Sequence, residues 1–264
     1  MAGCWEVINV ALLKATKLSK VFGGLKAVSN FEVIIEKGEL IGLIGPNGAG
    51  KTTAFNLLTG VYEPTTGEIE FDGKSMIGLK PYQITQHGLA RTFQNIRLFA
   101  ELSVLDNVKI AYHFHVKYGI LESVLHMGRY HKEEEELEKK AIALLDIFKL
   151  ADKKNEIAKN LPYGQQRRLE IARALAAQPK LLLLDEPAAG MNPQETHQLM
   201  EMIQWIRKEF DLTILLIEHD MSLVMNVCER IYVLEYGSII AQGTPEEIKN
   251  NPKVIEAYLG EEVE

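Results

Sequence analysis

Gly45 to Thr53 have the residue types and the spacing of a loop that binds phosphates. The stretch fits the pattern G-x-x-x-x-G-K-[ST]. Glycines permit positive φ angles, so successive backbone N–H groups can turn toward a phosphate chain. Lys51 supplies a charge for the β- and γ-phosphates, and the hydroxyl of Thr52 supplies a ligand for Mg²⁺. The residues that we expect to contact a nucleoside triphosphate are Gly45, Pro46, Asn47, Gly48, Ala49, Gly50, Lys51, Thr52 and Thr53.

Two acids stand side by side at the end of an apolar run. Asp185 and Glu186 close the sequence Leu-Leu-Leu-Leu-Asp-Glu, which is typical of a strand buried on both faces. In open α/β sheets, ligands bind at the carboxyl ends of strands. There Asp185 can hold Mg²⁺, directly or through a water, and Glu186 can polarise an attacking water. An acid pair at a strand end is often only solvated, but the phosphate-loop pattern upstream favours the chemical interpretation.

The segments on either side of the phosphate loop are those that such a loop needs. Glu39–Ile44 is an apolar run that predicts a buried strand, and Thr53–Thr59 predicts a helix whose N-terminus faces the anion. A plain glycine turn between a strand and a helix is the alternative. The complete motif with both flanks makes a nucleotide site the better interpretation, and it predicts an α/β fold.

Composition places the chain among ordinary globular proteins. It has 264 residues, of which 47% are hydrophobic and 25% charged, and its formal net charge is -7. This charge argues against a nucleic-acid partner bound through a general basic surface. Two cysteines, Cys4 and Cys228, make no disulfide or metal framework, which favours a reducing compartment. No signal peptide and no apolar run of about 20 residues is visible, so we expect any membrane contact to pass through a partner.

The other segments of the chain differ in the spacing of their apolar residues. An edge strand is expected at Ala11–Lys17, and the expected strand Leu89–Phe93 ends at Gln94. Between about Asn95 and Leu161 helical spacing replaces strand-like runs, and we interpret Glu133–Glu136 as the solvated face of a helix. The α/β alternation resumes at Gln165. Further strands are expected at Asn30–Glu36, Glu68–Phe71, Leu212–Ile217, Ile231–Leu234 and Ser238–Ala241, with a hairpin at Asp72–Gly73. Further helices are expected to start at Pro81, Pro193, Asp220, Pro245 and Pro252.

Six motifs in the right order resemble those of the ATP-binding cassette (ABC) ATPases, and the likeness covers residues 11 to about 260. Leu161-Pro-Tyr-Gly-Gln165 is similar to the signature motif of that family, usually Leu-Ser-Gly-Gly-Gln. The resemblance implies that Phe22 stacks on adenine, that Gln94 is the glutamine of the glutamine loop and that His219 is the switch histidine. It implies a signature of Leu161, Pro162, Tyr163, Gly164 and Gln165 and a dimer-contacting loop of Ala189, Gly190, Met191 and Asn192.

The resemblance also implies a fold and a division of the chain. The fold is a phosphate-loop NTPase (RecA-like) core with an antiparallel β subdomain and an inserted α-helical subdomain. Residues 1–10 would be an N-terminal extension and residues 11–260 a single nucleotide-binding domain. Within it, residues 11–94 and 165–245 would form the ATP-binding core, residues 95–164 the helical subdomain and residues 245–264 the C-terminal helices.

In the family, two such domains close head to tail over two ATP molecules. The signature helix of one then faces the γ-phosphate held by the other, with N–H groups at Gly164 and the residues after it. The resemblance implies that Glu186 is the general base, that His219 reaches the γ-phosphate, and that Thr52, Gln94 and Asp185 hold Mg²⁺. Pro162 and Tyr163 depart from the usual Ser and Gly. Since proline lacks the hydroxyl that would bond the γ-phosphate, we expect weaker closure or slower turnover.

Several short sequence segments are similar to those of one branch of the family, the larger ATPase subunit of branched-chain amino acid importers. They include Arg91–Asn95, Asp185–Pro193 and Gly243–Pro252. This implies a second ATPase subunit, two membrane permease subunits and an extracytoplasmic binding protein as partners, at the cytoplasmic face of the membrane. ATPases of lipopolysaccharide export and urea import are close alternatives. A soluble ABC ATPase of repair or translation, or a phosphate-loop kinase or GTPase, fits less well.

Two further features have simple interpretations. His113 and His115 are two residues apart on an expected helix, so they do not share a face and we do not expect a metal site. Leu98 and Phe99 follow Gln94 in an expected exposed loop. We interpret them as part of a docking groove for a helix of the membrane partner, in preference to packing under the helical block.

Overall fold

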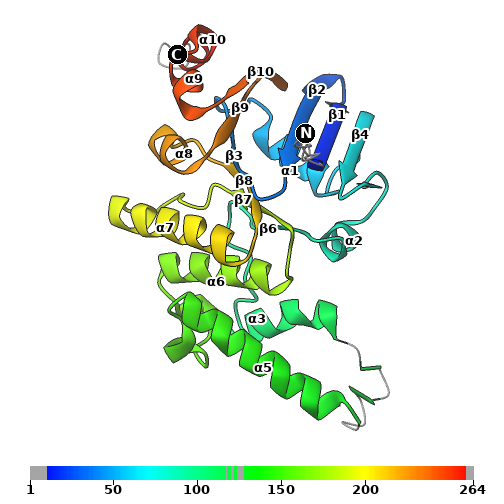
Figure 1. Ribbon diagram of the computed structural model, residues 1–264, viewed down its shortest axis with the longest axis vertical. Helices are drawn as coiled ribbons and strands as arrows, with labels where there is room; N and C mark the ends of the chain where they lie inside the picture. The colour runs from blue at the N-terminus through cyan, green and yellow to red at the C-terminus, as the bar shows by residue number, and fades with distance from the viewer. Residues whose placement is uncertain (1–10, 117, 120–121, 124–127, 260–264) are drawn as a thin grey trace, which may run out of the picture.

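The computed structural model describes residues 11–116, 118–119, 122–123 and 128–259. The expected N-terminal extension, Cys4 and the last five residues of the expected C-terminal helices lie outside this range. Figure 1 shows an elongated molecule with the helix α5 (Tyr130–Ile147) near one end and α10 (Pro252–Leu259) at the other. Two sheets lie between them, toward the α10 end.

The central sheet has the strand order β10-β9-β3-β8-β7-β6 within the described residues. Its strands pair in parallel except β10, which runs antiparallel to β9. Every residue of β3, β7 and β8 is buried, as their unbroken apolar runs predict. The bounds are Leu40–Ile44 for β3, Leu89–Arg91 for β6, Leu181–Asp185 for β7, Thr213–Ile217 for β8, Arg230–Glu235 for β9 and Ser238–Gly243 for β10.

Alternate residues of one strand serve two cores. Leu181 and Leu183 of β7 pack into a core shared with α1 (Lys51–Leu58) and the second sheet. Leu182 and Leu184 pack into the core on the other face, shared with residues of α6 (Tyr163–Ala176), α7 (Pro193–Glu209) and α8 (Met221–Val227). Because side chains alternate along a strand, a four-leucine run buries both faces of the sheet. This is why the acids that end β7 have a rigid support.

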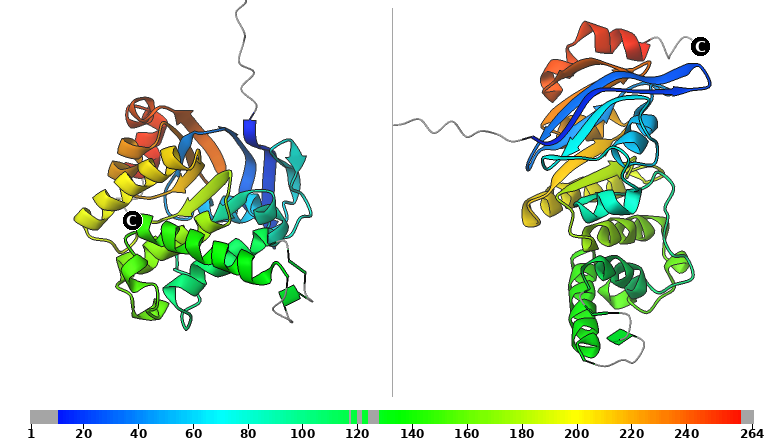
Figure 2. Two further views of the ribbon diagram at one scale, coloured as in Figure 1. Left: turned by 60° about the horizontal axis from the view of Figure 1, so that its bottom comes forward. Right: turned by 90° about the vertical axis from the view of Figure 1, so that its right-hand side faces the viewer.

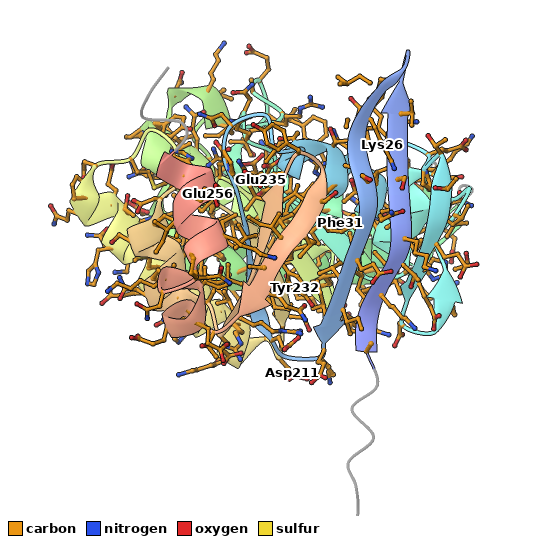
Figure 3. The ribbon with its side chains drawn as sticks, turned by 90° about the horizontal axis from the view of Figure 1, so that it is seen from above. Lys26, Phe31, Asp211, Tyr232, Glu235 and Glu256 are labelled. Carbon is orange, nitrogen blue, oxygen red and sulfur yellow. The ribbon has the colours of Figure 1, made fainter. Side chains whose placement is uncertain are left out.

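The second sheet is antiparallel, with the order β2-β1-β4-β5. The expected edge strand is wrong in two respects, because β1 is longer and lies between β2 and β4. Figure 3 shows the long β1–β2 hairpin from above, beside strands of the central sheet. There Tyr232 of β9 joins the sheets, since its hydroxyl donates to Ile34 O at 3.0 Å. The bounds are Ala11–Phe22 for β1, Leu25–Glu36 for β2, Thr66–Phe71 for β4 and Lys74–Ser75 for β5.

The described residues between 103 and 161 are mostly helices and turns, and Figure 2 shows them at the end of the molecule opposite the β1–β2 hairpin. Ser103 caps α3 (Val104–Tyr112) by accepting from Asp106 N, as a helix start requires. The helix α5 packs on α3 through Leu137, Ala141 and Leu145, one apolar stripe of the helix. The described part of this block also includes the short 3-10 helices η1 (His113–His115), η2 (Ala151–Lys153) and η3 (Ala158–Asn160).

Glu134 on α5 is more than a solvated acid, which corrects the expectation for Glu133–Glu136. Its carboxylate pairs with Lys109 at 3.0 Å and His113 at 3.0 Å, and accepts from the Tyr118 hydroxyl at 2.7 Å. Burial raises the pKa of Glu134, but these hydrogen bonds outweigh burial and lower that pKa to about 2. His113 thus ties η1 to α5. No group of three or more metal-type side chains occurs among the described residues, to which the side chain of His115 does not belong.

Two element ends differ from the expected ones near the chemistry. The strand β6 ends at Arg91, and Phe93 and Gln94 follow in a loop. The helix α6 begins at Tyr163, two residues before the expected start, so Tyr163 and Gly164 are in its first turn. Helices start at the expected prolines in α2 (Pro81–Gln86), α7, α9 (Pro245–Lys249) and α10, and the expected Asp220 is the N-cap of α8.

Candidate functional site

The phosphate loop joins the carboxyl end of β3 to α1. Lys51 is the first residue of α1 and is buried, and its ammonium donates to the carbonyls of Gly45 at 2.6 Å and Pro46 at 2.9 Å. These bonds hold the loop in a closed curve. Gly50, at the N-cap of α1, has a φ of 101°, and no side chain caps the helix. The N-terminus of α1 therefore faces the loop cavity with its positive dipole end, which suits an anion.

Two glycines of the loop are required by space as well as by conformation. A Cβ at Gly45 would collide with the carbonyl of Leu234 on β9, and Gly45 has a φ of 154°. A Cβ at Gly50 would lie 2.5 Å from the carbonyl oxygen of Ala27 on β2. Neighbouring strands of both sheets thus press on the loop, and only glycine fits at these two positions.

Glu186 follows β7 in a conformation that non-glycine residues rarely adopt, with a φ of 45°. Its N–H donates to Ile217 O at 2.9 Å, which locks the backbone to β8. The carboxylate oxygen Oε2 accepts from Gln94 Nε2 at 2.7 Å and lies 3.7 Å from His219 Nδ1. Such strain is kept where the surroundings over-determine it, often at sites of chemistry. The structure therefore brings together three side chains that sequence reasoning predicted separately.

Asp185, the last residue of β7, precedes Glu186 and is nearly fully buried. Its Oδ2 receives Arg91 NH2 at 3.2 Å, and the same guanidinium donates to Asn56 Oδ1 at 2.8 Å and Thr59 Oγ1 at 3.0 Å. Burial raises the pKa of Asp185, and the charge of Arg91 offsets part of that rise. Sequence reasoning missed this role of Arg91, although an arginine at the end of a buried strand was a signal for a carboxylate partner.

The donors near the loop fit a magnesium ion bound together with a triphosphate. Mg²⁺ takes hard oxygen ligands, commonly one or two carboxylates beside substrate phosphates. Thr52 offers a hydroxyl, Gln94 a carboxamide oxygen and Asp185 a carboxylate, and Thr52 and Gln94 line the same cavity. A site of this kind does not need a cluster of acids.

A cavity of about 440 Å³ lies in front of the phosphate loop. It unites Asn47–Thr53 with Gln94 and Glu186, whereas Gly45, Pro46, Asp185 and His219 lie outside its lining. Sequence reasoning missed four lining residues: Leu25, Lys26, Ala27 and Tyr236. Tyr236 lies in the turn after β9, and β9 is the neighbour of β3 in the central sheet. The rule that ligands gather at carboxyl strand ends could have found it.

Phe22, the expected adenine platform, stands at the end of β1, where the hairpin turns into β2. Its ring is 40% exposed, contacts Tyr62 edge-on with 5.2 Å between ring centroids, and lies under Lys20. Phe22 does not belong to the lining of the loop cavity, although Leu25, its strand partner, does. Stacking on adenine stays a prediction.

The signature segment lies away from the loop cavity. Leu161 is buried, and Pro162, Gly164 and Gln165 line a separate pocket of about 170 Å³ together with Met191. Gln165 N–H donates to Pro162 O at 2.9 Å, so this amide closes the first turn of α6. The helix α6 starts earlier than predicted, and the expectation that amides at Gly164 and after it face an anion stays a prediction. Tyr163 and Gly164 hold the first two positions, whose amides have no partner within a helix.

The expected dimer loop, Ala189 to Asn192, links β7 to α7. Asn192 caps α7 in a capping box with Glu195, with bonds of 2.9 and 3.0 Å. Just before the loop, Ala188 N–H donates to Glu218 Oε1 at 2.9 Å. Glu218 is buried, and burial raises its pKa. This acid, which sequence reasoning missed, joins the strand that leads to His219 with the segment that leads to the dimer loop.

Comparison with known proteins gives the same assignment along most of the chain. Residues 28–189 match the family model described as ABC transporter, and residues 238–264 match that of the branched-chain amino acid ATP-binding cassette transporter. The LivG high-affinity branched-chain amino acid transport ATP-binding protein of Salmonella typhimurium is 49% identical over 250 residues, 95% of this chain and 98% of its own length. BraF of Pseudomonas aeruginosa is 46% identical over the same shares.

Solved structures agree. An ATP-binding cassette of an ABC transporter in its ADP conformation superposes with a TM-score of 0.82 at 32% identity, covering 95% of this chain and 99% of its own. Among the described residues no helix is long and apolar enough to cross a membrane. The expected phosphate-loop NTPase fold and the expected ATPase activity are confirmed. This chain belongs to the ATPase subunits of ABC transporters, in the family of branched-chain amino acid transport ATP-binding proteins.

Proposed function

We propose that this chain hydrolyses ATP to drive the import of the branched-chain amino acids leucine, isoleucine and valine. The substrate class rests on relatives with that function in their names and on the C-terminal family match. The observation that carries the catalytic half is the contact of Gln94 with Glu186 at 2.7 Å beside the phosphate loop. An acid with a polar partner, in the lining of the same cavity as the phosphate loop, supports this proposal.

The residues of the site would divide the work as follows. Lys51 and the loop amides bind the β- and γ-phosphates, and Thr52, Asp185 and Gln94 would hold Mg²⁺. The ion would supply neutralisation of charge on the phosphates. Glu186, fixed by its strained backbone, orients and deprotonates the attacking water as general base, and His219 stabilises the γ-phosphate.

The site needs a second ATPase subunit. The signature residues and the phosphate-loop residues line separate cavities of the same chain. A signature segment can therefore meet a γ-phosphate only when a neighbouring subunit presents it. A cassette that this chain resembles at 26% identity and a TM-score of 0.75 has been solved as a dimer in a post-hydrolysis state with ADP and Pi. We infer a head-to-tail dimer over two ATP molecules, heteromeric in the transporter, joined by residues 189–192.

We also propose the division into an ATP-binding core (11–94 and 165–245), a helical subdomain (95–164) and C-terminal helices (from 245). In this arrangement the chain works as a peripheral subunit at the cytoplasmic face of the membrane. It is bound there to two permease subunits, and an extracytoplasmic binding protein delivers the substrate.

The site for the permeases is a groove of about 580 Å³ between the core and the helical block. Phe99, which is 46% exposed, and Phe114 stand in its lining beside Arg97 and Arg173. Leu98 is not part of this groove: it is half-buried and packs on the core, which corrects the expectation of an exposed Leu98. Exposed aromatic rings flanked by arginines suit a short amphipathic helix of a partner.

Charging this groove should separate transport from hydrolysis. We expect Phe99→Asp to reduce substrate uptake by reconstituted vesicles at least about tenfold, since hot-spot aromatic residues contribute about 2 kcal/mol or more. The ATPase rate of the isolated subunit should stay within about twofold. Tyr82→Asp, at an exposed residue of α2 outside the groove lining, is the control. Normal uptake with Phe99→Asp would refute this docking site.

Replacing the proposed base tests the catalytic half. Glu186→Gln should lower the ATPase rate more than about a hundredfold while ATP binding persists, because the amide keeps a partner for Gln94 but takes no proton. Size-exclusion chromatography with ATP should then show a trapped dimer. Hydrolysis at the wild-type rate would refute the assignment of Glu186. Transport of another solute by the intact complex would refute the substrate class.

A further inference from the structure

Arg167 of α6 is a fully buried cation that grips the glutamine loop of its own chain. Its guanidinium donates to Phe93 O at 2.6 Å through NH1 and to Gln94 O at 2.7 Å through NH2. NH1 also donates to Glu170 Oε2 at 2.7 Å. A buried charge is stable only when it is paired and hydrogen-bonded, and these bonds provide that. The main chain at Gln94 therefore takes its position from the signature helix.

Glu170 extends the grip by one further bond. Its second carboxylate oxygen, Oε1, accepts from Arg97 N at 3.1 Å. One Arg–Glu pair on α6 thus holds the loop from Phe93 to Arg97 at three backbone atoms. Gln94 is fixed at both ends, because its backbone carbonyl binds Arg167 and its side-chain amide binds Glu186. A shift of Arg167 would move the partner of the proposed catalytic base.

Tyr163 connects this pair to the surface. The ABC ATPases usually have glycine here. In this chain the Tyr163 hydroxyl accepts from Arg167 NH2 at 3.2 Å, the same nitrogen that binds Gln94 O, and Arg167 lies 5.9 Å from the ring centroid. The ring is half exposed and borders the dimer loop, since a Cβ at Gly190 would lie 3.5 Å from its edge. Tyr163 therefore touches two segments expected to meet the partner subunit.

We propose that Tyr163 is a positioning residue for ATP hydrolysis, acting through Arg167 on the Gln94–Glu186 contact. Closure of a partner subunit onto the signature segment and the dimer loop presses on Tyr163. The displacement of Tyr163 shifts the guanidinium of Arg167, and this guanidinium shifts the glutamine loop of the same chain. Each subunit thereby links the partner's nucleotide to its own catalytic acid. The inference rests on the proposed function for the roles of Gln94 and Glu186.

The test removes the hydroxyl and keeps the ring. Tyr163→Phe should lower kcat for MgATP roughly three- to tenfold, as one lost hydrogen bond to a charged group implies, with KM and the affinity for ATP unchanged. Tyr82→Phe, on α2, is the matched control and should leave kcat unchanged. A merely structural role would lower thermal stability and affinity together and would not give this split.

A double-mutant cycle identifies the route. In a Gln94→Ala background, Tyr163→Phe should change kcat by less than about 1.5-fold, because the end of the route is missing and the two effects are not additive. Full additivity, or a wild-type kcat in Tyr163→Phe, would overturn the inference while leaving the proposed function intact. Absence of any ATPase activity in the wild-type chain would instead count against the proposed function.

Discussion

The phosphate loop and the signature segment each lead into the N-terminus of a helix. The chain surrounds only the first of these helix ends with groups that can bind a phosphate. Ser103, Asn192, Asp220 and Thr244 each cap the helix that follows them. The helices α1 and α6, like α5, have no side-chain cap. At α1, strands of both sheets, Gln94 and Glu186 surround the open helix end. At α6 the described neighbours of the helix start include Gly190 and Met191 of the dimer loop and residues of α7.

This difference shows how one chain can bind ATP by itself and still need a neighbour for turnover. The cavity at α1 has two lysines, several hydroxyls, two carboxamides and one carboxylate in its lining. The lining of the pocket at α6 has one arginine, Arg168, and one acid, Glu195, among the described residues, so the opposite charges balance there. A helix N-terminus alone carries only partial positive charge. Substitutions at α1 should therefore affect binding, whereas substitutions at α6 should affect turnover.

The largest effect is expected at the phosphate loop. Lys51→Ala removes the two bonds to the carbonyls of Gly45 and Pro46 and the charge for the phosphates. ATP affinity should fall roughly ten- to a hundredfold, and hydrolysis should become undetectable, since hydrogen bonds to charged groups contribute about 1.5 to 3 kcal/mol. Calorimetric titration with ATP measures the affinity.

Lys37→Ala is the matched control for that measurement, because Lys37 pairs with Asp211 on the exposed surface. Its affinity should equal that of the wild type. Binding by Lys51→Ala at the wild-type affinity would remove the contrast between the two helix starts.

An intermediate effect is expected at the signature. Pro162→Ser supplies a hydroxyl at the N-cap of α6, and we expect kcat to rise roughly three- to tenfold with unchanged ATP affinity. Pro162→Ala is the control, because it removes the ring and restores the backbone N–H, as serine does, but adds no hydroxyl. Steady-state ATPase assays distinguish the two. An unchanged or lower rate in the serine variant would show that the partner's phosphate does not need this hydroxyl.

The smallest effect concerns Glu218, which follows β8 and binds the segment before the dimer loop through Ala188 N–H. Its pKa is higher in the folded chain than in the unfolded chain because burial disfavours the carboxylate, with Glu186 adding to the rise and His219 opposing it. Its contribution to stability is therefore complete below the unfolded pKa, about 4.3, and is lost as the pH rises through the folded value.

Glu218→Gln keeps an oxygen for Ala188 N–H but cannot ionise. Relative to wild type, its Tm should rise as the pH increases above the unfolded pKa of about 4.3, by an amount on the order of 2 °C. Thermal melts across this range provide the measurement. A Tm difference that does not depend on pH would mean that Glu218 does not titrate in the folded chain.

The sequence predicted elements well where local chemistry decides them. The four leucines before Asp185 bury both faces of a sheet in any α/β context, and the glycines and lysine of the phosphate loop have one common use. It failed where tertiary contacts decide. It placed β1 at an edge, started α6 too late because Tyr163 and Gly164 are weak helix formers, and treated Glu134 as solvated.

The sequence by itself determined that this chain has a phosphate loop, a metal-type acid and a candidate base, because these depend on residue types a few positions apart. Only the tertiary structure decided that Gln94 meets Glu186, 92 positions away, and that Arg167 grips the carbonyl of Gln94, 73 positions away. Strand order and helix placement set those contacts, and both follow from burying apolar faces over the whole chain. No local pattern contains that information.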